Sequence, residues 1–508
     1  MKKLFKKVKR LFSKINKSTL VKRNLSYILL FLMFITYSTV LSIVSIDNLN
    51  RFRYPAFDIG IFDQGIYLLS QGKDPFVTVR GLHLFGDHIQ FIAIFLAPLF
   101  WIWDDVRILL IAQSVALGMG VIPIYLIAKE KLKSKWLPLI FSLSYMLNPA
   151  LHYLNLENFH LVSFAVPILL FAFYFLIKGN YRLFFVFIIL ALITRQELTL
   201  TVMAMGIYAF FKLDKKTGIT TGLLGLIWLI AIFKIIFPYY VPFEHPNLKR
   251  GGDIVGRLKE MVFNPKEILS LASEENKKYI FDLFFPVAFM PFLSPSTLFL
   301  ASPAIAINLI TTWPYAHSIQ YHYTYAIIPF IFISSIYAFS NLREMFMRKN
   351  WKFYKKIFYT LLIIFVTCSL LSNYYISPES TSIRSSSFIE IVKNFNKFNE
   401  WEKARYEALS LIPKNATVSA TYLFLPHISH REIIYMFPNP FKEVYWGYEL
   451  GNYTPPPPTK DVDFIILDDT PNQFEEENII KPLIEEKKYV VIFEWNRIRV
   501  LRKNTFLS

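Results

Sequence analysis

Apolar runs long enough to cross a lipid bilayer recur along this chain up to about residue 376, and they limit what it can fold into. A transmembrane helix needs about 20 mostly apolar residues, because its backbone polar groups must find their partners inside the helix. The composition agrees, with 54% hydrophobic, 17% aromatic and only 18% charged residues. The sequence therefore predicts an α-helical polytopic membrane protein and excludes a soluble enzyme.

The distribution of Lys and Arg sets the predicted topology, since these residues collect on the cytoplasmic side. Ten basic residues in the first 23 positions contribute to the net charge of +18, and we interpret them as a cytoplasmic membrane anchor rather than a nucleic-acid-binding segment. The apolar run 88–103 is interpreted as interfacial or re-entrant, because counting it as a crossing would place KEKLKSK (129–135) outside. About eleven spans remain, with the amino terminus in the cytoplasm: 24–46, 106–128, 136–152, 160–177, 183–194, 198–211, 217–237, 280–294, 296–312, 322–341 and 357–376.

A change in composition after residue 376 predicts a second domain. The expected organisation is a basic cytoplasmic segment at 1–23, a transmembrane domain at 24–376 with a long first outer loop at 47–105, and a small soluble α/β domain at 377–508 outside the cell membrane. A helix is expected at 388–409, followed by β-rich segments at 416–422, 432–437, 462–468 and 488–501. Cys368 is the only cysteine, so the chain has no internal disulfide.

The predicted topology places the most informative polar residues on the outer face. They are Asp58 and Asp63 in FDIGIFDQG (57–65), His88 in GDHIQ (86–90), Glu157 and His160 in LENFH (156–160), Arg195, Glu197, His317, Tyr321, His322 and Tyr323. A charged group at the membrane boundary needs a partner. These side chains are therefore expected to line one cavity that opens to the outside.

Most of these candidates also have a purely structural explanation. Asp63 can cap or solvate its helix, and His88 can form an N-cap pair with the preceding aspartate. Arg195 and Glu197 can close two short spans as an ion pair, and the tyrosines fit an interfacial aromatic belt. His427 and His430 in the outer domain are typical of surface histidines. Asp58 is the strongest functional candidate.

An ordered set of segments carries a resemblance: FDIGIFDQGIYLLSQG, GDHIQFIAIFLAPLFWI, NLENFH, RQE, SIQYHYTYAIIPFIF (318–332) and LPHISHREIIYMFP (425–438). Together they resemble a family of uncharacterised polytopic membrane proteins, a domain of unknown function. That family is similar in turn to the GT-C class of glycosyltransferases, which use sugars carried on polyprenyl phosphates. The resemblance implies hexosyl or pentosyl transfer from a polyprenyl-phosphate donor to a protein, lipid or glycan acceptor at the outer face of the membrane.

The resemblance also implies roles for individual residues. Asp58 matches the first-loop acid that acts as a general base or orients the acceptor, and Glu157 matches the second-loop acid. Arg195 is the first choice for the group that holds the lipid phosphate. The other expected contacts to substrate or phosphate are Asp63, His88, His160, Glu197, His317, Tyr321, His322 and Tyr323. Asp58, His88 and Glu157 are a possible ligand set for Mg²⁺ or Mn²⁺, although Asp58 and Asp63 are not adjacent as in the paired acidic motif of some relatives.

Two other functional classes remain open. A transporter or flippase of a lipid-linked substrate would show charges near the bilayer midplane and two matching halves, whereas the polar residues here lie at the boundaries and no repeat is visible. A noncatalytic receptor or assembly protein would depend on residues 380–508 and not on Asp58.

Overall fold

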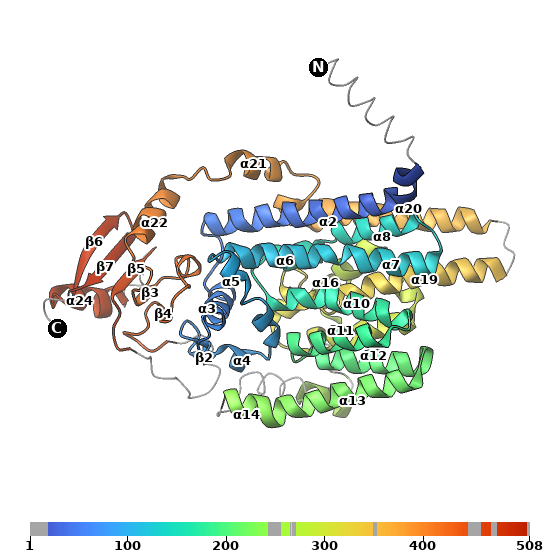
Figure 1. Cartoon of the computed structure of the whole chain (residues 1–508), viewed down its shortest axis with the longest axis horizontal. Coiled ribbons are helices and arrows are strands. Elements are labelled where there is room, and N and C mark those ends of the chain that lie inside the picture. The colour runs from blue at the N-terminus through green and yellow to red at the C-terminus, as the bar shows by residue number, and fades with distance from the viewer. Residues whose placement is uncertain are drawn as a thin grey trace, which may run out of the picture.

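The computed structural model describes residues 19–241, 256–264, 266, 271–348, 353–444, 459–468 and 475–504. The basic segment predicted at 1–23 therefore lies almost wholly outside the described residues. Helices form one side of the molecule and a small sheet lies at the opposite end (Figure 1). The helices before the sheet domain, apart from those of the first outer loop, are α2 (Thr19–Asn50), α6 (Arg107–Met119), α7 (Val121–Leu132), α8 (Leu137–Met146), α9 (Pro149–Leu156), α10 (Ala165–Ile177), α11 (Tyr181–Thr194), α12 (Leu198–Lys212), α13 (Lys215–Ala231), α14 (Phe237–Tyr240), α16 (Glu274–Phe284), α17 (Pro295–Leu298), α18 (Ser302–Ile310), α19 (Ile328–Arg348) and α20 (Tyr354–Ile376).

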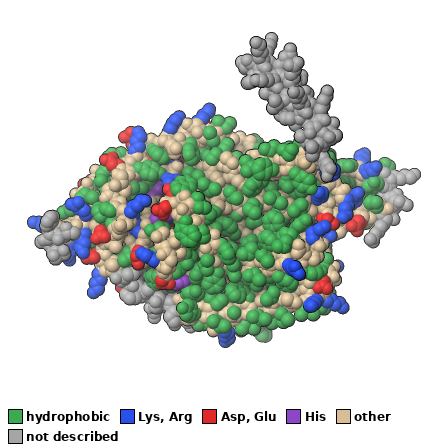
Figure 2. Space-filling model, in the orientation of Figure 1, with side chains coloured by type: hydrophobic (Ala, Val, Ile, Leu, Met, Phe, Trp, Pro, Cys, Tyr) green, Lys and Arg blue, Asp and Glu red, His purple; other side chains and the backbone are tan. Residues whose placement is uncertain are grey.

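The outer surface of the helical part is apolar. Figure 2 shows hydrophobic side chains covering the face of the molecule over the helices, with charged side chains gathered towards its two ends. Four helical stretches are long and apolar enough to cross a membrane: Asn24–Asn50, Arg107–Leu132, Lys215–Tyr240 and Tyr354–Ile376. In the third of these only 17% of the most apolar window is buried inside the protein. Contact of such an apolar surface with lipid is favourable, whereas its contact with water is unfavourable.

The predicted spans 280–294 and 296–312 are not continuous helices. After α16 the chain forms η5 (Phe285–Val287), η6 (Met290–Leu293), α17, η7 (Phe299–Ala301) and α18. Pro286, Pro291 and Pro295 each stand at the start of one of these short elements. Proline has no backbone N–H and clashes with the preceding helical turn, so it starts a helix but does not continue one.

Helices α12 and α13 pack closely because glycines line their contact. A Cβ atom on Gly218 would lie 2.4 Å from the backbone nitrogen of Phe210, and one on Gly206 would lie 2.7 Å from that of Gly222. In a membrane, such close backbone approach replaces the hydrophobic effect as the source of helix association.

We expect Gly218→Leu to destabilise this helix pair by about 1–3 kcal/mol, because the new side chain must push the two backbones apart. The change is measured as a lower Tm in detergent. Gly222→Ala is the matched control, since a Cβ there would meet nothing within 4 Å. Equal Tm values for the two variants would contradict the prediction.

The first outer loop is ordered. It contains α3 (Ile59–Ser70), the hairpin β1 (Phe76–Val77) and β2 (Leu82–His83), α4 (Leu84–Asp87), η1 (Phe91–Phe95) and α5 (Leu99–Ile102). The last two elements occupy the apolar run 88–103, and each is far too short to cross a bilayer. Trp101 and Ile102 are 71% and 80% exposed, as expected for a segment that lies on the membrane surface.

The outer domain is built on a five-stranded sheet in the order β4-β3-β5-β7-β6. Its elements are α21 (Ser387–Asn394), α22 (Glu400–Ser410), β3 (Val418–Ala420), η11 (Leu425–His427), β4 (Ile434–Met436), β5 (Phe464–Leu467), η13 (Glu476–Ile480), α24 (Lys481–Glu485), β6 (Tyr489–Trp495) and β7 (Ile498–Lys503). Strand β3 pairs in parallel with both β4 and β5, while β7 is antiparallel to β5 and β6. The helix predicted at 388–409 is two helices, because Asn399 and Glu402 form a capping box that starts α22.

The outer domain packs directly on the first outer loop. A Cβ on Gly60 would lie 2.5 Å from Leu425 Cδ2, so the Leu425 side chain packs directly on this glycine. Gln64 donates to the backbone carbonyl of Glu432 at 3.2 Å, and the Thr78 hydroxyl donates to that of Ile434 at 2.6 Å. These contacts place the turn after β3 beside the start of α3 (Figure 1).

Candidate functional site

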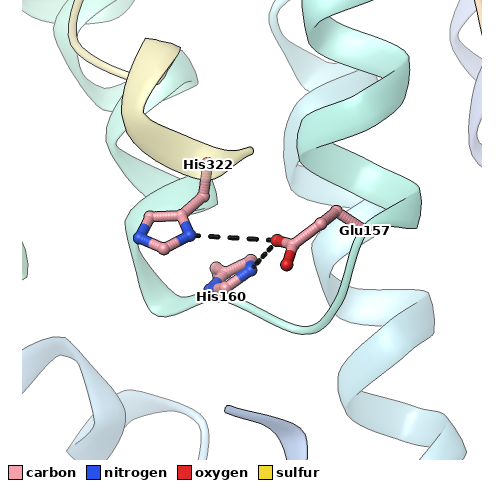
Figure 3. Close-up of side chains that lie close together, drawn as sticks. All are labelled: Glu157, His160 and His322. Atoms are coloured by element: carbon pink, nitrogen blue, oxygen red, sulfur yellow. Dashed lines mark hydrogen bonds and ion pairs between the residues drawn. The ribbon is translucent and has the colours of Figure 1, made fainter. Parts of the chain in front are cut away.

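Three side chains from two outer segments form a compact cluster. Glu157 is the C-cap of α9, His160 precedes η2 (Leu161–Phe164), and His322 opens η9 (His322–Thr324). Figure 3 shows the carboxylate of Glu157 facing both imidazole rings. The cluster thus joins the LENFH segment to a loop about 160 residues later in the chain.

The distances within the cluster are short. His160 Nε2 lies 2.5 Å from Glu157 Oε2, and His322 Nδ1 lies 3.8 Å from the same oxygen. The two imidazole rings are 4.0 Å apart between centroids. The other nitrogen of His160, Nδ1, is 3.9 Å from Asp58 Oδ1. His160 therefore connects the acid of the first outer loop to the acid of the next.

The backbone holds Asp58 in a strained conformation. It is the N-cap of α3 with φ of 65° and ψ of −79°, a region that residues other than glycine rarely adopt. Such strain costs about 1–3 kcal/mol and clusters at functional sites. The carboxylate is 24% exposed, which leaves it reachable from outside.

The charges in the cluster shift the pKa values in opposite directions. Burial raises the pKa of Asp58 to about 6, and the charge of Glu157 adds to this, whereas His160 opposes it. Burial also disfavours the charged forms of Glu157 and His160, but their mutual attraction outweighs it, so the pKa of Glu157 is lowered and that of His160 is raised. Burial and the charge of His160 lower the pKa of His322 to about 3.

These pKa shifts indicate the protonation chemistry of two side chains, Asp58 and His322. Asp58 is a carboxylate with a pKa close to neutral pH, which suits a group that accepts a proton during a reaction. The lowered pKa favours a neutral His322 imidazole, whose buried Nδ1 faces Glu157 Oε2 at 3.8 Å, beyond hydrogen-bond distance. A buried nitrogen without a hydrogen bond is costly unless a ligand uses it.

The same trio has the composition of a metal site. One atom each of Glu157, His160 and His322 lies within 4.8 Å of the others. Two imidazoles and one carboxylate suit Mn²⁺ or Zn²⁺ better than Mg²⁺, which prefers oxygen ligands. His88, expected to join Asp58 and Glu157 at a metal, instead lies 3.0 Å from Gln196 through its Nδ1. His160 and His322 take the position that the sequence interpretation gave to His88.

Arg195 is buried next to the cluster. Its Nε donates to Glu197 Oε2 at 3.0 Å, so the ion pair considered as the structural alternative does form. The positive charge of Arg195 also acts on Asp58, His160 and His322. Arg195 is therefore close enough to influence the site electrostatically while it closes the junction between α11 and α12.

The other residues expected at the site divide into two groups. Tyr321 and Tyr323 lie beside the cluster. Burial, the neighbouring Tyr315 and the charge of Glu157, in decreasing order, raise the pKa of Tyr321. The Tyr323 ring stacks on His322 with 4.3 Å between the ring centroids. His317 does not join them. Its Nδ1 lies 2.5 Å from Asn276 Oδ1 and its Nε2 lies 2.8 Å from the carbonyl of Thr311. Both ring nitrogens therefore have partners in neighbouring segments and not in the cluster.

Asp63 joins a different cluster. His430 Nε2 lies 2.9 Å from Asp63 Oδ1, and His430 Nδ1 lies 2.7 Å from Asp104 Oδ1. The His430 ring is sandwiched by aromatic contacts with Tyr67 and Phe100. His427 likewise stacks on Phe52 at 4.1 Å. Both histidines, interpreted from sequence as surface residues, are partly buried against side chains of the first outer loop.

Tyr422, in the turn after β3, is the residue near the cluster that the sequence interpretation missed. The charges of Asp58 and Glu157 act on its hydroxyl and, after burial, raise the pKa of Tyr422. Tyr422 is far from the other site residues along the chain, so no sequence motif links it to them. Only the packing of the outer domain brings it near the cluster. The Glu157 and His160 spacing, by contrast, was visible as two ligands three residues apart.

Comparison with known proteins identifies the fold. A family model described as "Predicted membrane protein (DUF2079)" matches residues 48–496. The crystal structure of ArnT from Cupriavidus metallidurans bound to undecaprenyl phosphate is similar with a TM-score of 0.55 and 11% identity, covering 94% of this chain and 98% of that chain. The apo crystal structure of the same protein has a TM-score of 0.52 with the same identity and coverage. None of the curated proteins matches. The likeness confirms the predicted fold class, a GT-C-like helical membrane protein with a small C-terminal sheet domain.

Proposed function

Since the chain belongs to the DUF2079 family of predicted membrane proteins and has the fold of ArnT, we propose that it is a membrane glycosyltransferase. The donor is a sugar carried on a polyprenyl phosphate, and the acceptor is a protein, lipid or glycan at the outer face of the membrane. The observation that carries the proposal is the meeting of Asp58 with Glu157 and His160 at the outer end of the helices. Catalytic groups must converge on one reacting centre, and the short distances among these three side chains support that role.

The proposed reaction needs few protein groups. The acceptor oxygen or nitrogen attacks the anomeric carbon, a new glycosidic bond forms, and the bond from that carbon to the phosphate oxygen breaks. Asp58 takes the proton from the acceptor, and polyprenyl phosphate leaves with the bonding electron pair. Attack from the face opposite the phosphate inverts the anomeric centre.

Arg195 and His160 supply positive charge to this reaction. The departing phosphate gains negative charge as the bond breaks, and a fixed cation in a partly buried site stabilises it. Arg195 is held by Glu197 and keeps its charge at any physiological pH. His160 is held beside Asp58 by its contact with Glu157. Both residues thus place positive charge near Asp58.

The membrane orientation forms part of the proposal. The amino terminus lies in the cytoplasm, and the outer domain, the first outer loop and the site lie outside. The Lys-rich turn after α7 and the basic end of α19 then face the cytoplasm, as the positive-inside rule requires.

We further propose that Glu157, His160 and His322 hold a divalent cation. An ion would be held by one atom each of Glu157, His160 and His322, and it would replace the proton between His160 and Glu157. When bound, it supplies a positive charge that favours an anionic phosphate or an ionised acceptor.

Metal binding is expected to be lost without these ligands. Wild-type protein stripped with chelator should bind Mn²⁺, followed by loss of the free-ion signal in electron paramagnetic resonance. His322→Ala and Glu157→Gln should weaken binding at least tenfold, because each removes one of three ligands. His83→Gln is the control, since His83 pairs with Asp74 in the hairpin of the first outer loop. Unchanged Mn²⁺ affinity in both cluster variants would contradict the metal proposal.

The test of the main proposal is turnover. Purified protein is given a panel of polyprenyl-phosphate sugars with native membrane extract, and free polyprenyl phosphate and glycosylated product are measured by mass spectrometry. Product formation is the expected result. Binding or movement of the donor across a vesicle membrane without its consumption would replace the enzyme by a transporter.

A further inference from the structure

The turn after β3 carries an aromatic side chain from the outer domain to the candidate site. Phe424 and Leu425 donate their backbone N–H groups to the carbonyl of Thr421, which closes the turn that contains Tyr422. Leu425 packs on Gly60, two residues after Asp58, and the Phe424 ring meets Phe52 at 5.8 Å. The turn is therefore fixed against the segment that presents Asp58.

The Tyr422 side chain is left partly open by this packing. It is 37% exposed. Asp58, Glu157 and Tyr315 all act electrostatically on its hydroxyl and, together with burial, raise the pKa of Tyr422. Tyr422 therefore lies within electrostatic reach of both carboxylates, and the packing of Leu425 on Gly60 holds its turn next to the segment of Asp58.

A second group of aromatic rings approaches from the loop that carries His322. Tyr315, 44% exposed, makes an edge contact with Tyr321 at 4.7 Å and lies 5.1 Å from Trp313. Trp313 is held in place, because its indole N–H donates to the Tyr323 hydroxyl at 2.7 Å. Tyr321 directly precedes His322, whose Nδ1 lies 3.8 Å from Glu157 Oε2. Aromatic rings from two separate parts of the chain therefore lie near the two carboxylates.

This combination is the chemistry of a sugar-binding surface. The face of an aromatic ring is electron-rich and apolar, and it attracts the weakly positive C–H groups on one face of a sugar ring. Nearby carboxylates accept hydrogen bonds from the sugar hydroxyls. An interfacial aromatic belt accounts for tyrosines at the ends of membrane helices. It does not account for Tyr422, which belongs to the sheet domain.

We propose that Tyr422, with Tyr315 and Tyr321, forms a stacking site for a sugar ring, so that the outer domain contributes a specificity-determining side chain to the site. The inference rests on the proposed function for the identity of the reaction, but the binding of a sugar ring is a separate property. The ring belongs either to the donor or to a glycan acceptor, and both present the same C–H face.

The first test measures binding without turnover. Saturation-transfer NMR is recorded on full-length protein in detergent with methyl glycosides of glucose, galactose, mannose, N-acetylglucosamine and arabinose. The wild type should transfer saturation to C–H protons on one face of at least one glycoside. Tyr422→Ala should reduce that signal at least fivefold and Tyr422→Phe should keep it, because the ring and not the hydroxyl makes the contact. Tyr359→Ala, an exposed tyrosine on α20, is the control and should change nothing.

The second test separates the two sources of the sugar. If the protein turns over, a rise of about tenfold in KM for the donor in Tyr422→Ala assigns the ring to the donor, and the same rise for the acceptor assigns it to the acceptor. No signal from any glycoside with wild type, or an equal signal from Tyr422→Ala, overturns the stacking site. Saturation transfer that depends on Tyr422 in a protein without turnover would instead overturn the glycosyltransferase and keep the sugar site.

Discussion

Asp58→Asn should abolish sugar transfer, with a loss of roughly 10³–10⁴-fold in kcat and little change in donor KM. The amide keeps the size of the carboxylate but cannot take a proton. It also removes the negative charge beside His160, whose Nδ1 lies 3.9 Å from Asp58. Free polyprenyl phosphate and product, measured by mass spectrometry with a fixed donor and native extract, give the rate.

The control for Asp58→Asn is Glu432→Gln. The side chain of Glu432 is 66% exposed and pairs only with Lys73 on the surface of the outer domain, among the described residues. It should leave the rate unchanged. A rate above one tenth of wild type in Asp58→Asn, in protein that elutes and melts like wild type, would remove Asp58 from the proposed mechanism.

The second large effect concerns the attachment of the outer domain. Asp63→Asn is expected to destabilise the protein by about 3–5 kcal/mol, the usual cost of breaking a buried ion pair by removing one partner. The Asp63 side chain is 1% exposed and lies 2.9 Å from His430. The other oxygen of Asp63 has no hydrogen-bond partner among the described residues. The contact with His430 is therefore the main interaction that offsets the cost of burying the Asp63 charge. Thermal unfolding in detergent and protease cleavage of the outer domain measure the change.

Glu432→Gln again provides the comparison, because the surface pair with Lys73 is solvated and should contribute less than about 1 kcal/mol. Asp63 and Glu432 both join the first outer loop to the outer domain by one ion pair. A similar loss of stability in the two variants would mean that burial of the Asp63 pair does not matter.

The same pair makes the attachment sensitive to alkaline pH. Burial alone would lower the pKa of His430, but Asp63 and Asp104 raise it to about 9. Lys414, 3.9 Å from Asp104, opposes this weakly from the outer domain. A raised pKa stabilises the folded state fully below the ordinary histidine value near 6.5, and this contribution disappears as pH rises through about 9. Tm should therefore fall between pH 7 and 9.5 in wild type more steeply than in His430→Ala.

The positions of most membrane helices were accessible from sequence. The predicted spans 183–194 and 198–211 correspond closely to α11 (Tyr181–Thr194) and α12 (Leu198–Lys212), short as they are. In a bilayer each helix must satisfy its own backbone, so an apolar run defines a helix without reference to its neighbours. The spans at 280–294 and 296–312 failed because prolines inside them override the apolar pattern.

The site was accessible only in part. The first two outer segments supplied Asp58, Glu157 and His160 from sequence, and the structure brings these three together. His88, His317 and Asp63 each have a hydrogen-bond partner outside this group: Gln196, Asn276 and His430. All of these residues are polar and were predicted at the same depth, near the membrane boundary. The sequence therefore could not distinguish the residues of the cluster from the others.

The sequence by itself determined the class of protein and the positions of most of its helices. Only the tertiary structure decided that His322 completes the cluster of Glu157 and His160, that His430 joins the first outer loop to the sheet region, and that the turn carrying Tyr422 packs beside the segment of Asp58. The physical reason is that the hydrophobic pattern acts locally along each helix, whereas contacts between loops depend on how the helices pack. Close packing through small residues and loop-to-domain contacts leave no periodic signal in the chain.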